Sequence, residues 1–209
     1  MKINFNVYCF SLLFVFSSYF SLNAQSKFEF GAGILINHSK INEEVFVPLA
    51  PVTGSYKVRR QLALTTRLGY KYSERFHLNS GVGFSWLGAF KKDLTEQIVA
   101  STIEVPLQIE WNPRPYLHLS SGINYNYVYG FSSTVNENNS DLLPLIHSRH
   151  QLGLRHGIAI SHQQIEFSLS YSHYFTDLFR SSVMDENGNE IGSLIWTLSN
   201  IQLGIIFRG

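Results

Sequence analysis

The sequence is poor in cysteine: Cys9 is the single one among 209 residues. It lies in an apolar run, Val7 to Phe20, that follows Lys2 and precedes the small and polar residues 21–25. Such an order is typical of a secretory signal peptide, and the run is shorter than the ~20 residues of a spanning helix. We therefore expect residues 1–24 to be cleaved and residues 25–209 to form a domain with neither a disulfide framework nor a thiol nucleophile.

Long apolar runs and an excess of one charge are also missing. After residue 24 no stretch approaches ~18 uninterrupted apolar residues, so the sequence predicts no spanning helix. Loss of Lys2 with the signal peptide would leave 15 basic and 15 acidic residues. This balance argues against nucleic acid as a partner.

What the sequence does contain is alternation, most clearly from Tyr116 to Phe131. Every second residue there is large and apolar or aromatic, with one serine among them: Leu117, Leu119, Ser121, Ile123, Tyr125, Tyr127, Tyr129 and Phe131. The residues between them are mostly small or polar. Because side chains of a strand alternate between its faces, one face of this predicted strand is apolar and the other polar.

Seven more stretches alternate in the same way, at 27–38, 61–72, 76–90, 101–111, 149–161, 165–175 and up to residue 208. The connections alternate between short turns (73–75, 112–115, 162–164) and long loops (39–60, 91–100, 132–148, 176–192), with a short strand suggested at Val45–Val47. The bulky residues would not fit inside a small barrel but could face lipid. We therefore predict an all-β fold, an eight-stranded antiparallel up-and-down transmembrane β-barrel, located in the cell outer membrane with both termini periplasmic.

Three details of this prediction can be checked directly. Aromatic residues near the strand ends are expected to form two girdles, the outer one containing Trp86, Phe90, Tyr127, Tyr129, Phe131, Tyr171, Phe175 and Trp196. Pro106 removes a ladder donor, so we expect a bulge or a broken ladder there. His156 is expected to face lipid, because the opposite register would expose Arg155.

The chain resembles the PorT-like, OmpA-like family of outer-membrane β-barrel domains over nearly the whole of 25–209. The resemblance rests on Ile103–Leu107 (IEVPL), on Leu68–Tyr72 followed by Ser80–Ser85, and on Tyr171 through Thr176–Leu178. The chain departs from the family pattern with Tyr174-Phe175 before Thr176, and it continues two residues past its terminal aromatic, Phe207. The resemblance implies a barrel fold, and the relative that gives the family its name is linked to protein secretion and gliding.

Inward-facing charges suggest a filled lumen. Arg67, Glu104 and Arg155 are expected at mid-depth, with Glu104 between the two arginines, and Glu29, Glu166 and Arg208 near the periplasmic end. An eight-stranded barrel has room for side chains but hardly for a water-filled pore. Our hypothesis is an ionic plug that fills and specifies the lumen rather than adding net stability.

These observations favour a non-enzymatic protein that acts through its extracellular loops in surface interaction, envelope integrity or support of a secretion or motility assembly. We expect outer-membrane lipid as a partner, with envelope or secretion and motility proteins as further candidates, and neither a cofactor nor a metal. One alternative is a barrel enzyme that hydrolyses or transfers lipid acyl chains, for which Glu110, His118 and Ser120 are the best catalytic candidates. A second alternative is a soluble exported barrel that binds an apolar ligand.

Overall fold

The structure, a computed structural model, describes residues 27–46, 52–91, 96–135 and 138–209. The expected signal peptide lies outside these residues. The elements are β1 (Phe28–Phe46), β2 (Val52–Lys71), β3 (Phe76–Ser80), β4 (Gly83–Lys91), β5 (Glu96–Arg114), β6 (Leu117–Val135), β7 (Asn138–Asp141), the 3₁₀ helix η1 (Leu143–Leu145), β8 (His150–His162), β9 (Ile165–Tyr174), β10 (Phe179–Met184) and β11 (Glu190–Arg208). Within the described part of the chain, no helix is long and apolar enough to cross a membrane.

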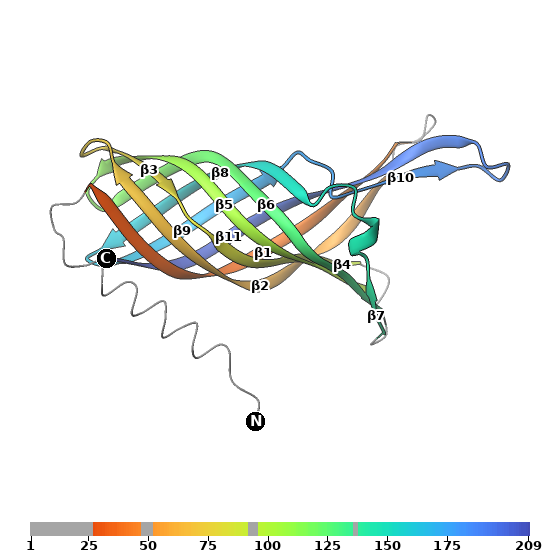
Figure 1. Cartoon of the computed structure of the whole chain (residues 1–209), viewed down its shortest axis with the longest axis horizontal. Helices are drawn as coiled ribbons and strands as arrows, with labels where there is room; N and C mark the ends of the chain where they lie inside the picture. The colour runs from red at the N-terminus through yellow and green to blue at the C-terminus, as the bar shows by residue number, and fades with distance from the viewer. Residues whose placement is uncertain (1–26, 47–51, 92–95, 136–137) are drawn as a thin grey trace, which may run out of the picture.

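The strands form one antiparallel sheet that closes on itself (Figure 1). β1 pairs with β2 on one side and with β11 on the other. β3 and β4 both pair with β2 and with β5, so they occupy one position of the ring between them. The remaining pairs, β5–β6, β6–β8, β8–β9 and β9–β11, complete a ring of eight positions. β7 and β10 lie outside this ring.

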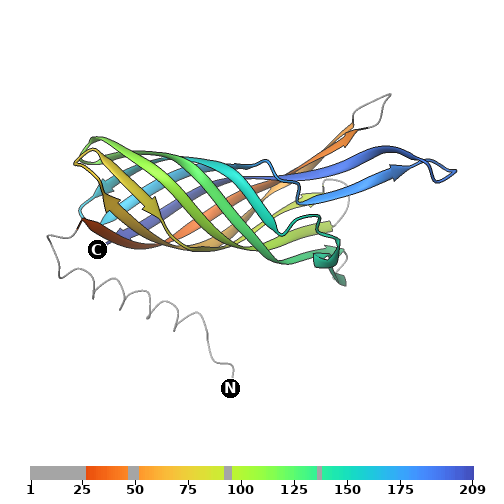
Figure 2. The same ribbon diagram turned by 45° about the horizontal axis from the view of Figure 1, so that its top comes forward.

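The two ends of the ring differ. At the end that we call the turn end, residues 72–75, 115–116 and 163–164 make short connections, and the C-terminus lies beside them (Figure 1). At the opposite loop end, β10 and β11 project well beyond the ring together with parts of β1 and β2 (Figure 2). Much of the first expected loop, 39–60, is strand, because β1 continues through Phe46 and pairs there with β11. The suggested short strand at 45–47 becomes part of β1, with residue 47 outside the described residues.

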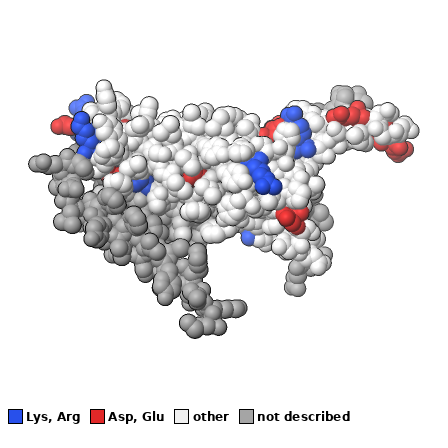
Figure 3. Space-filling view, in the orientation of Figure 1, with Lys and Arg blue, Asp and Glu red and all other residues white. Residues whose placement is uncertain are grey.

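The alternation of side chains follows the predicted faces along most strands. On β9, Phe167, Leu169 and Tyr171 are exposed on the outside, while Glu166 and Ser170 are buried inside. On the face drawn in Figure 3 most charged atoms gather toward the two ends, and the band between them consists mainly of other residues with a few small charged patches. The outside of the ring is thus an apolar belt, and the core of the molecule lies inside the ring.

A bulge reverses the alternation near the end of β6. The pairing of β5 with β6 shifts between Ser101 and Thr102, which pair with Gly130 and Val128 and leave Tyr129 as the extra residue. Beyond a bulge the side chains change faces. Phe131 is consequently 3% exposed and belongs to the interior, so its predicted place in the outer girdle is wrong.

Pro106 lies beside an interruption of the sheet, as expected. It pairs in register with Asn124 of β6 on one side. On its other side the ladder is broken, because β3 ends at Ser80 opposite Leu107 and β4 begins at Gly83 opposite Glu104. A residue without an N–H group can be accommodated there because the neighbouring strand requires no donor from it.

Candidate functional site

The interior of the ring is filled by side chains in successive layers, which we treat as the candidate site. Polar and charged residues occupy the layers from the turn end to the middle of the ring. Apolar residues occupy the layer at the loop end.

Inside the ring, near the turn end, lies an ionic cluster of Arg67, Glu110, Glu166 and Arg208. Nη1 of Arg67 donates to both carboxylate oxygens of Glu166 at 2.9 Å, and its Nη2 donates to Glu110. Arg208 donates to Glu166 as well. All four side chains are largely buried, so the charges compensate one another inside the ring rather than through water.

A second group at the turn end consists of Glu29, the half-exposed Lys71 and the buried His77. Nζ of Lys71 lies 2.8 Å from Oε1 of Glu29, and the Lys71 side chain is 46% exposed. Nδ1 of His77 lies 3.5 Å from Oε2 of the same carboxylate. Glu29 therefore belongs to this second group and not to the ionic cluster.

Glu104 is the buried carboxylate of the middle layer. It accepts hydrogen bonds from Oγ of Ser85 at 2.7 Å and from Nε2 of Gln202 at 3.2 Å. Nη1 of Arg155 lies 3.5 Å from Glu104, and Nη2 of Arg155 donates to Oγ of Ser170 at 3.0 Å. The expected contact between Glu104 and Arg155 is present.

The expected contact between Glu104 and Arg67 is absent, and the register explains why. Gly31 of β1 pairs with Arg67 on one side and with Arg208 on the other, so the two arginines lie at one level close to the turn end. Arg67 therefore meets Glu110 and Glu166 instead of Glu104.

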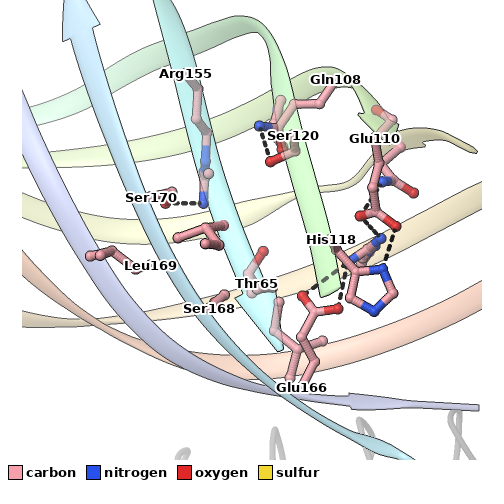
Figure 4. A pocket seen from close by; sticks show the side chains of 18 of the residues that line it. Thr65, Gln108, Glu110, His118, Ser120, Arg155, Glu166, Ser168, Leu169 and Ser170 are labelled. Carbon is pink, nitrogen blue, oxygen red and sulfur yellow. Dashed lines mark hydrogen bonds and ion pairs between the residues drawn. The ribbon is translucent and has the colours of Figure 1, made fainter. Parts of the chain in front are cut away.

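A small polar cavity of about 70 Å³ separates the ionic cluster from the middle layer (Figure 4). Its walls include Arg67, Gln108, Ser120, Arg155 and Ser170. Such a volume can hold several water molecules, and the lining offers them donors and acceptors. It is too small for a drug-sized ligand.

Tyr174 marks the next layer toward the loop end. Its side chain is fully buried, and its hydroxyl accepts hydrogen bonds from Nδ2 of Asn124 at 2.5 Å and of Asn126 at 2.8 Å. Beside it, Nδ2 of Asn200 donates to Oδ1 of Asn37 at 3.3 Å. Amide side chains thus supply the hydrogen bonds of this layer without any charge, while the Oδ1 atoms of Asn124, Asn126 and Asn200 are buried without a hydrogen-bond partner among the described residues.

The loop end of the lumen is closed by an apolar plug that we did not predict from the sequence. Its buried members include Ile41, Leu87, Ile98, Val128, Phe131, Leu178 and Leu198. Leu142, Leu143, Ile146 and Trp196 pack against them from the loop side, so Trp196 belongs here rather than to a lipid-facing girdle. Leu87 could have indicated this plug from the sequence, because the alternation of its strand places this large apolar side chain on the inward face.

The proposed catalytic candidates are placed differently from our expectation. Nδ1 of His118 lies 3.2 Å from Oε1 of Glu110, so these two residues do meet. Ser120 does not join them, because its hydroxyl is the partner of Nε2 of Gln108 at 3.3 Å. Oγ of Ser161 lies 2.8 Å from Nε2 of His118 instead. Within the described segments, no group of His, Cys, Asp and Glu residues is arranged to hold a metal ion.

No family model matches the chain, and no curated protein matches it by sequence. Among solved structures, a major outer membrane protein from Thermus thermophilus has a TM-score of 0.43 at 16% identity, over 85% of this chain and 99% of that one. The attachment invasion locus protein Ail of Yersinia pestis has a TM-score of 0.40 at 12% identity, over 86% and 98%. The outer membrane protease OmpT from Escherichia coli has a TM-score of 0.41 at 8% identity, over 87% and 97%. At such low scores, fold and function are inferred from this chain's own geometry.

Proposed function

We propose that the chain is an eight-stranded up-and-down transmembrane β-barrel of the outer membrane that acts at the cell surface through its loop end. The observation that carries the proposal is the reversed distribution of side chains. Large apolar residues are exposed on the outside, and carboxylates and arginines are buried inside. In water this arrangement would leave the apolar belt uncovered, whereas in a bilayer the belt contacts hydrocarbon and the closed ring leaves no unpaired edge.

The difference between the ends supports an orientation. Barrels of the bacterial outer membrane have short periplasmic turns and longer extracellular loops. The turn end and the C-terminus would then face the periplasm, and the loop end would face the outside. The first and last described residues, Lys27 and Gly209, both belong to the turn end, since N of Lys71 donates to O of Lys27 and N of Gly209 donates to O of Phe30.

The interior supports a barrel that does not conduct. The ionic cluster fills the lumen near the turn end, and the apolar plug closes it at the loop end. This filling also disfavours the alternative of a soluble barrel that holds an apolar ligand, because the apolar part of the interior is already occupied by the chain's own side chains.

The arm, formed by residues 42–46 of β1, 52–55 of β2, 179–184 of β10 and 190–197 of β11, is the surface best suited to a partner. At one level Val52 pairs with Val45, Val45 with Leu194, and Leu194 with Ser181, so four strands lie side by side. The arm presents exposed apolar side chains, among them Phe46 and Met184. We propose that it contacts other envelope proteins, with support of a secretion or motility assembly as one form of that role.

Location and orientation are tested together on intact cells. An epitope inserted after Gly188, at the tip of the arm, should be bound by antibody and removed by external protease. The same epitope inserted after Glu74, in the turn end, should react only after the outer membrane is opened. Recovery of the protein in the soluble periplasmic fraction, or the opposite pattern of labelling, would refute the proposal.

The role of the arm requires a separate test. Replacing residues 183–191 by a two-residue turn shortens the arm and leaves the strands of the ring intact. If the arm carries the function, cells with this variant should show the same envelope or motility defect as cells that lack the whole protein. An unaltered phenotype with normal amounts of folded variant would exclude the arm.

A further inference from the structure

We propose that Ser161 is a nucleophile activated by His118 and Glu110, and that the turn end of the barrel hydrolyses carboxylic esters. This inference goes beyond the surface role proposed above and runs against the expectation of a non-enzymatic protein. It concerns the opposite end of the molecule and does not depend on the arm.

The hydrogen bonds around His118 determine which ring nitrogen carries the proton. Nδ1 of His118 faces two acceptors, Oδ1 of Asn112 at 2.7 Å and Oε1 of Glu110 at 3.2 Å. Nδ1 must therefore be the protonated nitrogen of the neutral ring. The unprotonated Nε2 then faces Oγ of Ser161 at 2.8 Å and can accept its proton.

The other contacts of these residues hold the arrangement in place. Nδ2 of Asn112 lies toward the ring nitrogens of His77, which is consistent with Oδ1 as the atom facing His118. Glu110 is held by Arg67 and by Nδ2 of Asn79 at 2.9 Å, so its carboxylate is oriented by the ionic cluster. Glu110, His118 and Ser161 thus have the order of a serine hydrolase triad, in which Oδ1 of Asn112 is the hydrogen-bond partner of Nδ1 and the Glu110 carboxylate lies 3.2 Å from the same nitrogen.

The position of Ser161 makes it the accessible member of the three. It lies on β8 close to the turn at residues 163–164, and its backbone N–H donates to O of Tyr116 at 2.9 Å. Ser161 is partly exposed, whereas His118 and Glu110 are buried. A substrate would therefore approach from the mouth of the turn end and would not need to enter the filled lumen.

The reaction that this geometry supports is a two-step ester hydrolysis. Oγ of Ser161 attacks the carbonyl carbon of the ester while its proton passes to Nε2 of His118. The bond to the alcohol oxygen breaks, His118 returns the proton to the leaving alcohol, and an acyl group remains on Ser161. Water then attacks this acyl group and gives a proton to His118, and Ser161 regains a proton as the carboxylic acid leaves. Glu110 is a positioning residue that acts through His118.

The substrate class is a carboxylic ester, which could come from two sources. Because Ser161 faces the lumen side of β8, a water-soluble ester can reach it from the mouth. An acyl ester of a phospholipid could reach it only if the lipid leaves the leaflet that surrounds the turn end. Both sources present the same ester carbonyl to Ser161, so the experiment includes a separate assay for each.

The experiment uses the full chain, folded in detergent micelles. A fluorophosphonate probe should label the protein, and mass spectrometry should locate the adduct on Ser161. p-Nitrophenyl acetate and p-nitrophenyl butyrate test the soluble source, and vesicles of phosphatidylethanolamine and phosphatidylglycerol, assayed for released fatty acid, test the lipid source. Hydrolysis in either assay should fall by at least ~100-fold in Ser161→Ala and in His118→Asn, because removal of a nucleophile or a general base lowers rates by such factors.

Ser120→Ala is the matched control, because Ser120 is also a lumen serine on the strand of His118 but hydrogen-bonds to Gln108. It should retain both labelling and hydrolysis. Heat-dependent migration in electrophoresis shows whether each variant is folded. An unlabelled wild type, an adduct on a different residue, or hydrolysis that is the same in wild type and folded Ser161→Ala would each overturn the proposal. Because the adduct is located on the wild-type protein, this outcome does not depend on the folding of any variant.

Discussion

Arg67 of β2 and Glu166 of β9 form an ion pair across the interior of the ring, in which Nη1 of the arginine lies 2.9 Å from both carboxylate oxygens. The two residues are 99 positions apart in the sequence and lie on strands that do not pair with each other. This contact therefore exists only when the ring is closed.

Replacing Arg67 by Met should be strongly destabilising, because it leaves Glu110 and Glu166 short of a positive partner inside the ring. Removing one partner of a buried ion pair typically costs ~3–5 kcal/mol. Equilibrium unfolding in urea, followed by tryptophan fluorescence in micelles, measures the change. Lys71→Met is the matched control on the same strand, and its half-exposed pair with Glu29 should be worth no more than ~1 kcal/mol. Equal losses for the two variants would contradict the buried cluster.

The lumen should not conduct ions, because two separate layers fill it. In planar bilayers we expect neither the wild type nor Glu104→Ala to form large, steady channels, since the apolar plug remains intact in both. Combining Glu104→Ala with Leu178→Ser changes both layers and is the variant in which leak currents should first appear. Large, steady currents from the wild type would refute a filled lumen.

The bulge at Tyr129 predicts that two aromatic residues close together on β6 contribute very different amounts to the folding free energy. Phe131 is buried in the apolar plug, so Phe131→Ala should cost ~3–5 kcal/mol of folding free energy through the cavity it leaves. Tyr129 is 43% exposed on the outside, and Tyr129→Ala should cost clearly less. Unfolding curves of the two variants under identical micelle conditions give the comparison. The reverse ranking would indicate an uninterrupted β6 with Phe131 outward.

The break between β3 and β4 predicts that replacing Pro106 by alanine costs less stability than replacing Gly81 by alanine. A Cβ at Gly81 would clash with the backbone oxygen of Thr66, so Gly81→Ala should force the backbone to shift at a cost of ~1–3 kcal/mol. Pro106→Ala should cost only ~0.4–1 kcal/mol, chiefly through a more flexible unfolded chain. Thermal unfolding of both variants measures the difference. A larger loss for Pro106→Ala would mean that the proline has a role beyond the missing donor.

The tip of the arm should loosen in acid through Asp185. Hydrogen bonds from the side chain and backbone of Asn189, with further ones from Asn187, hold the pKa of Asp185 below its ordinary value. A lowered folded pKa means that this ordering is complete above the ordinary pKa and is lost as the pH falls through the lowered one. The backbone amide of Asn189, followed by NMR during acidification, should report the change. In Asp185→Ala the same amide should be insensitive over that range.

The sequence alone determined which side chains face outward and which face inward along most of the chain. Alternation is a property of the extended backbone of each strand, so Phe167 and Leu169 were assigned to the outside and Glu166 to the inside without knowledge of any neighbour. An interrupted ladder beside Pro106 followed from equally local chemistry, as did the approximate places of the short turns, although residues 112–114 of the predicted turn 112–115 belong to β5.

The partners of the inward side chains were decided only by the tertiary structure. Closing the ring tilts and staggers the strands, and the stagger brought Arg67 level with Arg208 rather than with Glu104. A single extra residue in β6 turned Phe131 inward, and the meeting of β5, β6 and β8 placed Ser161 rather than Ser120 at His118. Stagger and bulges arise from how strands pair with one another, so they cannot be predicted from the pattern of residues within any one strand.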